Sequence, residues 1–260
     1  MADALYTQTD SGVFLPTALT RGPWSPQSQH GGPPAALLAR AVEATEPAWM
    51  FVARFTVEFI RPVPIAPLTV GSRIIRPGKR VQLIEATLSA EAEPVARVVA
   101  LRIRIHDGID LPPGAGGPLE RLAPPETFES VRLVPVDWEN FGDALDTRPL
   151  IGGLTVPGPS VAWIRLLVPV VEDEAPSPLQ RVLVAADCGN GISSAVDIDR
   201  YLFINPDLTV YQHRPALGEW IGLDALTRLE SHGSGLAEAA LFDEQGRLGR
   251  SLQSLYVDER

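Results

Sequence analysis

The sequence predicts an α+β fold of two tandem units, each a curled antiparallel sheet wrapped around a central helix. The first observation is a repeat, because Thr56-Val57 followed by Arg61-Pro62 recurs as Thr209-Val210 followed by Arg214-Pro215, a shift of 209 − 56 = 153 residues. At that shift, ten of the forty-two residues from 56 to 97 are identical, which marks a duplicated unit. The second observation is that each copy combines one helix, apolar on nearly every side, with four strand-like runs. Such a helix is buried all round, so a sheet must enclose it.

In the first copy, a short strand is predicted over Val13–Leu19 and a helix over Pro33–Thr45. Prolines suit the first helical turn, where the N–H groups have no partner within the helix. In the last strand of this copy, isoleucines alternate with Arg102 and Arg104. This alternation predicts that the isoleucines face the core and the arginines face water. The four strands after the helix are predicted at residues 50–60, 68–76, 80–91 and 95–105.

The second copy repeats this order, with a helix over Pro178–Cys188 and four strands after it. The stretch between the copies is rich in Pro and Gly, which predicts a connector that packs over the surface, with Trp138 and Phe141 as its anchors. The predicted strands of the second copy cover residues 200–213, 219–230, 235–243 and 248–257. The predicted organisation is an N-terminal unit over 1–106, a connector over 107–158 and a C-terminal unit over 159–260.

Composition narrows the class of protein. With 260 residues and a hydrophobic share of 45%, the chain can bury a core and is not disordered overall. A net charge of −10, without any dense basic run, argues against nucleic acid as the main partner. Cys188 is the single cysteine, so no disulfide framework is expected, and neither an apolar signal region nor a membrane-span-length stretch is present. We therefore expect a soluble, cytoplasmic protein.

One candidate site precedes the first helix. His30, Gly31 and Gly32 lie there, and the second copy lacks this string. Two glycines let the backbone approach a ligand closely, and the free N–H groups at a helix start can stabilise a developing oxyanion. His30 can hydrogen-bond a substrate carbonyl. An ordinary turn explains the same three residues, and the tripeptide by itself does not decide between these interpretations.

A second set of candidates belongs to the second copy. Asp187 ends its apolar helix, where the first copy has an alanine, and a carboxylate at the negative end of the helix dipole needs compensation. A structural hydrogen bond to nearby amides and a role as general base both provide it. Gln253 lies on an apolar inward face where the first copy has Ala100 (253 − 153 = 100), and Asn205 begins a strand, where a turn-forming role is its commonest explanation. Together, Asp187, Asn205 and Gln253 can hold one water molecule.

Other types of site find no support. The cysteine and histidines have no metal-ligand spacing, and no glycine-rich nucleotide fingerprint follows a predicted strand. The nucleophile elbow Gly-x-Ser-x-Gly is absent, which disfavours a serine hydrolase. We therefore expect neither a metal nor a cofactor.

Several short motifs, in order and spacing, resemble a known family over nearly the whole chain. They comprise Asp146–Leu150, Ala162–Arg165, Pro178–Asp187, Leu208–Pro215, Gly218–Trp220 and Leu252-Gln253. The chain resembles the double hot dog acyl-CoA thioesterases of the acyl-CoA thioesterase II-like group. The 153-residue repeat predicts that the two curled sheets join edge to edge, and the resemblance implies a hydrolase of lipid metabolism that cleaves fatty acyl-CoA.

The resemblance also assigns roles. In the family, an Asp, a Thr or Asn, and a Gln hold the attacking water, and these roles fall on Asp187, Asn205 and Gln253. Asn205 stands where the well-known members carry Thr, which keeps the hydrogen-bonding capacity. In single hot dog relatives, a His-Gly-Gly loop and a helix acid come from different subunits. Here the loop with His30 and the acid Asp187 belong to different halves, so one site is expected between them. The backbone N–H groups of Gly31–Gly32 would stabilise the oxyanion.

The resemblance also suggests a homodimer, because single hot dog enzymes pair and a fused double unit can pair again. Two alternatives remain beside the thioesterase. A hot dog hydratase or dehydratase needs a histidine paired with an acid, and His30 with Asp187 can form such a pair in space. A non-catalytic acyl-CoA-binding protein is the other alternative, although loss of site residues is expected in that case and all three are present here.

Overall fold

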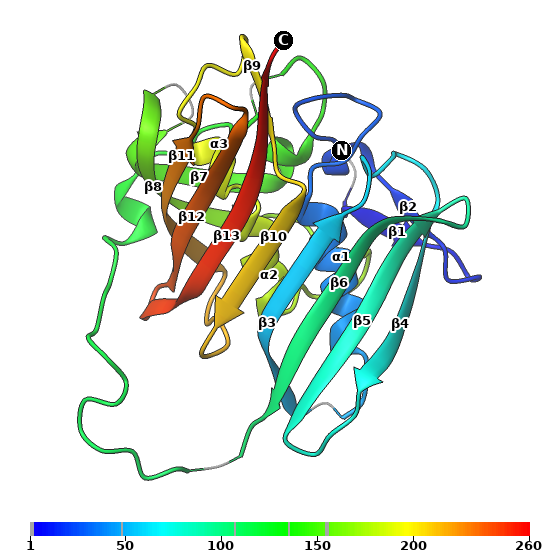
Figure 1. The fold of residues 1–260 in the computed structure, drawn as a ribbon, viewed down its shortest axis with the longest axis vertical. Helices are drawn as coiled ribbons and strands as arrows, with labels where there is room; N and C mark the ends of the chain where they lie inside the picture. Colours follow the sequence, from blue (N-terminus) through cyan, green and yellow to red (C-terminus); the bar gives the residue numbers. More distant parts are fainter. Residues whose placement is uncertain (1–2, 48, 107, 135, 154–155) are drawn as a thin grey trace.

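Two helices lie side by side behind one continuous sheet (Figure 1). The structure is a computed structural model, and it describes residues 3–47, 49–106, 108–134, 136–153 and 156–260. The helices are α1 (Gly32–Glu43) and α2 (Pro178–Ala186), and the short α3 (Gly189–Ile192) follows α2 directly. Single 3-10 turns lie at Ala18–Thr20, Pro125–Thr127 and Phe141–Ala144. Of the helices in the described part of the chain, none has the length and apolar character needed to cross a membrane.

The strands divide between the two halves of the chain. The first half forms β1 (Tyr6–Gln8), β2 (Phe14–Pro16), β3 (Met50–Phe59), β4 (Leu68–Arg76), β5 (Val81–Ala90) and β6 (Glu93–Arg104). The second half forms β7 (Leu145–Gly153), β8 (Val156–Leu166), β9 (Tyr201–Ile204), β10 (Asp207–Gln212), β11 (Trp220–Leu229), β12 (Ser234–Asp243) and β13 (Gly246–Glu259). The sheet order is β1-β2-β4-β5-β6-β3-β10-β13-β12-β11-β8-β7, with β9 paired to β13. The predicted edge-to-edge joining of the halves is confirmed and occurs between β3 and β10.

The two copies of the repeat pair with each other at β3 and β10. Thr209 lies opposite Thr56, its own counterpart at the 153-residue shift, and the two hydroxyl oxygens are 3.2 Å apart. The neighbouring pairs are reciprocal, because Leu208 pairs with Val57 while Val210 pairs with Phe55. A residue that pairs with its own copy marks a local twofold axis. The same shift carries β4, β5 and β6 onto β11, β12 and β13 to within two residues at each end.

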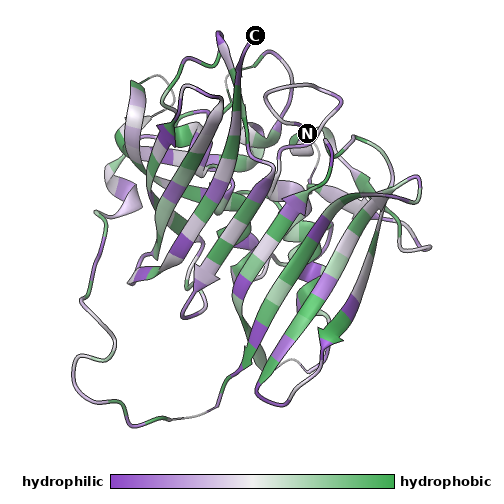
Figure 2. Cartoon of the chain, viewed as in Figure 1, coloured by the Kyte–Doolittle hydropathy of each residue, from purple (hydrophilic) through white to green (hydrophobic). Residues whose placement is uncertain are grey.

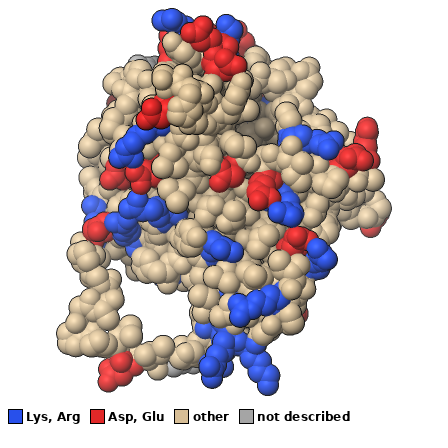
Figure 3. Space-filling model, viewed as in Figure 1, with Lys and Arg blue, Asp and Glu red and all other residues tan. Residues whose placement is uncertain are grey.

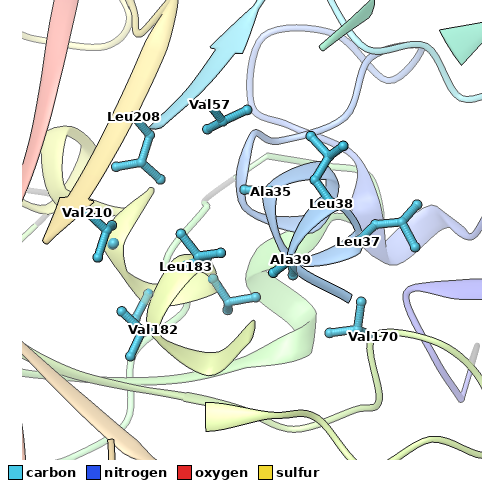
Figure 4. Packing of buried hydrophobic residues seen from close by; sticks show 14 of the residues in the cluster. Ala35, Leu37, Leu38, Ala39, Val57, Val170, Val182, Leu183, Leu208 and Val210 are labelled. Atoms are coloured by element: carbon cyan, nitrogen blue, oxygen red, sulfur yellow. The ribbon is translucent and has the colours of Figure 1, made fainter. Parts of the chain in front are cut away.

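The core lies between the helices and the sheet. On α1, small residues such as Ala35 and Ala39 are fully buried, and Leu183 of α2 packs close to them (Figure 4). Val57 and Leu208, on the two joined strands, close this space from the sheet side (Figure 4). The small side chains let the helices approach, so the predicted burial of both helices on nearly every side is confirmed. The alternation of apolar and polar residues along the strands is visible in Figure 2.

Two predicted strands are shorter than expected. The strand predicted over Val13–Leu19 is limited to β2, and a 3-10 turn replaces its second half. The strand predicted at 200–213 is split into β9 and β10, because Asn205-Pro206 interrupts it. Proline has no N–H group to donate to the ladder, so a strand breaks or bulges at such a position.

Part of the segment predicted as a connector is ordered as strands. The hairpin β7–β8 extends the sheet beyond β11, and its Pro149, Pro157 and Pro159 had concealed the period-two pattern. The two expected anchors do contact the rest of the protein. Trp138 Nε1 donates to the carbonyl of Gly22 at 3.3 Å, and Phe141 is fully buried.

The predicted orientation of β6 is wrong. Arg102 is only 1% exposed, whereas Ile103 and Ile105 are 41% and 58% exposed. The inward face of β6 carries Ala96 and Ala100, whose small side chains leave room for α1. The larger isoleucines therefore lie on the outer face. The guanidinium of Arg102 reaches carbonyl oxygens at the C-terminal end of α1 instead of water.

Candidate active site

Because α1 and α2 run antiparallel, their ends meet at two places. At the first junction, the N-terminal end of α1 meets the C-terminal end of α2; at the second junction, the C-terminal end of α1 meets the N-terminal end of α2. All six site residues predicted from the sequence lie at the first junction, and they come from four separate segments. His30, Gly31 and Gly32 form the turn into α1, Asp187 caps α2, Asn205 lies between β9 and β10, and Gln253 lies on β13.

Asp187 is the centre of the site. Its side chain is 1% exposed, and its Oδ1 accepts from Asn205 Nδ2 at 2.9 Å and from Gln253 Nε2 at 3.4 Å. Gln253 is also 1% exposed, and its Oε1 accepts the backbone N–H of Asn190 at 3.1 Å. Both ends of the Gln253 amide are therefore engaged, and its N–H group fixes the orientation of the carboxylate. This satisfies the requirement that a buried carboxylate be hydrogen-bonded.

His30 approaches the other carboxylate oxygen. Its Nδ1 lies 2.8 Å from Asp187 Oδ2, and at 15% exposure its side chain is the more accessible of the two. A bare nitrogen lone pair and a carboxylate oxygen repel each other at this distance, so a proton belongs between them. The backbone of His30 donates to the carbonyl of Thr20 at 2.8 Å, and its ring packs on Phe141 with 4.8 Å between centroids. The backbone of His30 is thus fixed by Thr20, and its ring is fixed by Phe141 and Asp187.

Gly31 allows this close approach. A Cβ atom built on Gly31 would lie 2.8 and 2.9 Å from the two carboxylate oxygens of Asp187 and 2.7 Å from the ring of Phe59. A side chain at this position would therefore displace the carboxylate. Gly32 is less crowded, because its Cβ would be 3.1 Å from Phe141. The first glycine of the pair is the one that the geometry requires.

Three neighbours of the site were not identified as such from the sequence. Phe59 and Phe141 flank the glycines, and Asn190 supports Gln253. Phe141 was predicted only as a packing anchor, and Phe59 carries no sequence signal beyond its place at the end of a strand. Cys188 also adjoins Asp187, but burial and, to a lesser extent, the charge of Asp187 raise the pKa of its thiol well above the usual value. Cys188 is consequently not an activated nucleophile.

Within the described ranges, no group of three or more His, Cys, Asp or Glu side chains is arranged to hold a metal ion. The side chains and backbone groups of the first junction have the following chemical capacities. A buried carboxylate beside an imidazole can accept and return a proton. The backbone N–H of Gly32, at the start of α1, points towards His30 Nδ1 at 3.3 Å and is placed where it can receive a developing negative charge.

Two family models cover most of the sequence. Residues 20–103 match the N-terminal domain of acyl-CoA thioesterases, and residues 120–257 match the C-terminal domain. The chain belongs to the acyl-CoA thioesterase family. It is accordingly a thioester hydrolase. The N-terminal domain supplies His30, Gly31 and Gly32, whereas the C-terminal domain supplies Asp187, Asn205 and Gln253. The first junction is therefore built by both domains of this thioesterase.

Solved structures show the same fold at low sequence identity. A conserved protein with the hot dog fold from Alicyclobacillus acidocaldarius has a TM-score of 0.75 at 15% identity, with 99% of this chain and 97% of the other covered. A candidate thioesterase II from Thermobifida fusca has a TM-score of 0.72 at 16% identity, covering 98% and 96%. An acyl-CoA thioesterase II from Mycobacterium marinum has a TM-score of 0.66 at 15% identity, covering 98% and 95%. No curated protein matches the thioesterase sequence significantly. These likenesses establish the hot dog fold.

Proposed function

We propose that the first junction hydrolyses the thioester of fatty acyl-CoA to the free acid and CoA. The observation that carries this proposal is the buried carboxylate of Asp187, oriented by two amides and placed against His30 at the start of a helix. Each half of the chain supplies part of this arrangement, so one site per chain follows. The organisation that we propose is a double hot dog with units at 1–106 and 159–260 and a connector at 107–158.

In the proposed mechanism, Asp187 is the general base. It takes a proton from a water molecule that attacks the thioester carbonyl, and Asn205 and Gln253 hold the carboxylate in position. Collapse of the tetrahedral intermediate breaks the C–S bond. The thiolate of CoA then receives the proton that Asp187 took, so that the free acid and CoA–SH leave and Asp187 is regenerated. Each atom of the water thus appears in the products.

The oxyanion of that intermediate is assigned to the turn before α1. The N–H of Gly32 lies 3.3 Å from His30 Nδ1, whereas Asp187 Oδ2 lies only 2.8 Å from the same nitrogen. Because a ring nitrogen serves one hydrogen bond at a time, the shorter contact takes precedence and the N–H of Gly32 remains available for a substrate oxygen. Backbone donors of this kind contribute most when they are fixed before the reaction, as they are at a helix start.

Release of CoA from a panel of acyl-CoA thioesters, followed with a thiol reagent, tests this function. The wild-type chain is expected to release CoA and free acid in equal amounts, with a preference among chain lengths. Tight binding of the whole panel without release of thiol would contradict the proposal and would support the non-catalytic acyl-CoA-binding protein.

A hydratase or dehydratase is the second candidate, and the 2.8 Å contact between His30 and Asp187 favours it because that chemistry needs a histidine beside an acid. Loss of the enoyl-CoA absorbance on hydration measures this activity directly. Hydration that depends on His30, without release of CoA, would replace the thioesterase mechanism. Release of CoA without hydration would exclude the hydratase.

We further propose that the protein is cytoplasmic, acts in lipid metabolism and forms a homodimer. The homodimer is proposed because single hot dog units pair with one another. The chain already contains the equivalent of one such pair, and this pair can associate with a second copy. Light scattering at micromolar concentration is expected to give twice the chain mass of 28.0 kDa. A strictly monomeric mass would contradict the dimer while leaving the chemistry of the first junction unaffected.

A further inference from the structure

The segment between the two copies forms a compact turn beside the first junction. The 3-10 turn Phe141–Ala144 begins at its N-cap Asn140, whose side chain is fully buried. Asn140 Oδ1 accepts the backbone N–H of Gly142 at 2.8 Å, and Asn140 Nδ2 donates to the carbonyl of Trp138 at 2.8 Å. Both ends of the amide are therefore engaged. We call Asn140–Ala144 the connector turn.

An ion pair closes the connector turn from outside. The backbone N–H of Asn140 donates to Asp143 Oδ2 at 3.0 Å, which completes a capping box. Arg132 Nε and Nη2 donate to the two carboxylate oxygens of Asp143 at 2.8 and 3.0 Å. Burial alone would raise the pKa of Asp143, but the hydrogen bonds from Arg132 and Asn140, together with the charge of Arg132, lower it below its usual value. Asp143 is thus ionised at neutral pH and accepts all three bonds.

Consecutive carbonyl groups of the first copy hold both the connector turn and His30. The carbonyl of Thr20 accepts the backbone N–H of His30 at 2.8 Å. The next carbonyl, that of Arg21, accepts the backbone N–H of Phe141 at 3.0 Å. Because the two carbonyls belong to adjacent planar peptide groups, they fix the backbones of His30 and Phe141 relative to each other.

Phe141 covers one face of the imidazole of His30. The ring centroids are 4.8 Å apart and the ring planes are tilted by 34°, and such aromatic pairs have preferred geometries. Rotation of the imidazole about its Cβ–Cγ bond would drive its edge into Phe141, and the same rotation would turn Nδ1 away from Asp187 Oδ2, which lies 2.8 Å from it. Phe141 is fully buried, so we expect it to act on His30 and not to contact the substrate.

We propose that Phe141 and Asn140 are positioning residues for the thioesterase reaction. Phe141 holds the imidazole of His30 with Nδ1 towards Asp187, and Asn140 holds Phe141 in place through the connector turn. The segment between the copies is then a third contributor to the first junction, beside the two copies themselves. This role rests on the proposed function, in which His30 and Asp187 belong to the reacting site. Groups that are fixed before the reaction contribute most to the rate.

Steady-state kinetics on acyl-CoA separate positioning from binding. Phe141→Leu should lower kcat by about tenfold, which is less than the roughly hundredfold cost of a 1 Å displacement because Leu still fills part of the space. KM should stay at the wild-type value, since a fully buried ring makes no contact with the substrate. Phe242→Leu is the matched control, because Phe242 is a buried phenylalanine in a separate cluster with Trp163 and Trp220. It should keep the kcat of the wild type.

Asn140→Ala tests the capping residue. It should lower both the urea midpoint of unfolding and kcat, because the connector turn loses its N-cap and Phe141 loses its fixed position. Ser177→Ala removes the equivalent residue from the capping box of α2, so it should lower the urea midpoint and leave kcat unchanged. Asn140→Ser retains an oxygen that caps well and should recover most of the kcat lost in Asn140→Ala.

The ion pair allows a test that leaves the buried residues intact. Arg132 is 44% exposed, so Arg132→Ala loosens the connector turn without opening a cavity. We expect kcat to fall by about fivefold at most, the upper value for an exposed ion pair. Arg228→Ala is the matched control and should keep the kcat of the wild type, because Arg228 pairs with Glu238 on β11 and β12. Basic and acidic side chains are interspersed over the face of the sheet shown in Figure 3.

Proton NMR measures the contact between the two rings. The ring current of Phe141 should shift the imidazole C–H signals of His30 upfield, and His30→Gln identifies these signals by their loss. The shift should disappear in Phe141→Leu, decrease in Asn140→Ala and remain in Ser177→Ala. Because a buried contact is recorded directly, this measurement separates positioning from a general loss of stability.

The proposal is overturned if folded Phe141→Leu keeps the kcat of the wild type, if Phe242→Leu loses as much kcat as Phe141→Leu, or if the His30 signals stay unchanged in Phe141→Leu. A wild type that releases no CoA would refute the proposed function, and the NMR shifts would still measure how the imidazole is held. Release of CoA with equal kcat in Phe141→Leu and the wild type would refute only the positioning role.

Discussion

The two helix junctions are related by one local twofold axis, yet they share almost none of their polar side chains. At the first junction, Asp187 is held by two amides and lies 2.8 Å from an imidazole. At the second junction, Glu43 has the hydroxyl of Ser177 as its hydrogen-bonding partner, and Val52 and Ala100 stand where the amides would be. The duplicated fold therefore supplies the frame twice, and a few substitutions leave the side chains that we propose for hydrolysis at one junction only.

The two junctions also differ in the residue that caps the N-terminus of the helix. At the first junction the N-cap of the helix is Gly31, which makes no side-chain cap, whereas at the second it is Ser177, which caps α2 in a complete capping box. The first junction thus forgoes a stabilising cap so that the backbone can lie against a carboxylate. The second keeps the cap and has a cavity instead.

Among variants that leave the polar side chains of the site intact, the largest effect is expected for Gly31→Val. The added side chain would meet both carboxylate oxygens of Asp187 and the ring of Phe59 at less than 3.0 Å. Displacing a catalytic group by about 1 Å typically costs about a hundredfold in rate, so kcat/KM on acyl-CoA should fall by at least this order. Gly71→Val is the control, because nothing lies within 4 Å of a Cβ built there. Equal activity in both variants would show that the approach of Gly31 to Asp187 is irrelevant to turnover.

A smaller loss is expected when the amides are removed singly. Asn205→Ala and Gln253→Ala each delete one hydrogen bond to the carboxylate of Asp187 and leave the carboxylate itself in the protein. Gln253→Ala also deletes a bond to the backbone carbonyl of Asp187. Hydrogen bonds to a charged group contribute about 1.5–3 kcal/mol, which corresponds to roughly ten- to a hundredfold in kcat. Gln212→Leu, which removes an amide at the second junction, should keep the kcat of the wild type. A loss of turnover in Gln212→Leu that matches the loss in Gln253→Ala would contradict the assignment of chemistry to one junction.

Ser177→Ala should affect stability and leave hydrolysis unchanged. Ser177 Oγ accepts the backbone N–H of Gln180 at 3.1 Å and donates to Glu43. Loss of an N-cap of this kind costs about 1 kcal/mol in the free energy of unfolding, measurable by urea denaturation. Ser177→Thr, which retains a hydroxyl, is the matched control and should recover most of the loss. A fall in kcat with unchanged stability would instead place Ser177 in the reaction.

The smallest effect expected is a pH dependence that originates at Glu43. Burial raises the pKa of this carboxyl above its usual value of 4.5, so the folded protein binds its proton more tightly than the unfolded chain does. This stabilisation is complete below the unfolded-state pKa and is lost as the pH rises through the folded-state pKa. Glu43→Gln abolishes the titration, so the stability of the variant relative to wild type should increase from about pH 4 towards neutrality. A difference in unfolding free energy that stays constant over this range would contradict the prediction.

The sequence predicted the helices and most strands because apolar periodicity is strong in them. It also predicted the six residues of the first junction, since these are what the two copies do not share. It did not predict β7 and β8, because proline and glycine interrupt their alternation. The prediction of which face of β6 points inward was also wrong. Packing against α1 requires small residues on that face, and this requirement outweighs the hydrophobicity of the isoleucines.

The parts of the site that escaped prediction depend on tertiary contact. Phe59 and Phe141 come from separate segments, and nothing in their local sequence shows that both pack around one pair of glycines. One wall of the cavity at the second junction includes Arg102, which the sequence pattern assigned to the solvent face. Such features follow from how the two copies are joined, which the repeat alone does not specify.

The most direct test of the central claim compares the two carboxyl groups in one assay. Asp187→Asn and Glu43→Gln make the same chemical change at equivalent ends of the two helices. Removing a general base typically lowers turnover by about a hundred- to ten-thousandfold. We expect that loss of CoA release in Asp187→Asn and wild-type release in Glu43→Gln. Wild-type release in Asp187→Asn, or an equal loss in both variants, would contradict the claim that hydrolysis belongs to the first junction alone.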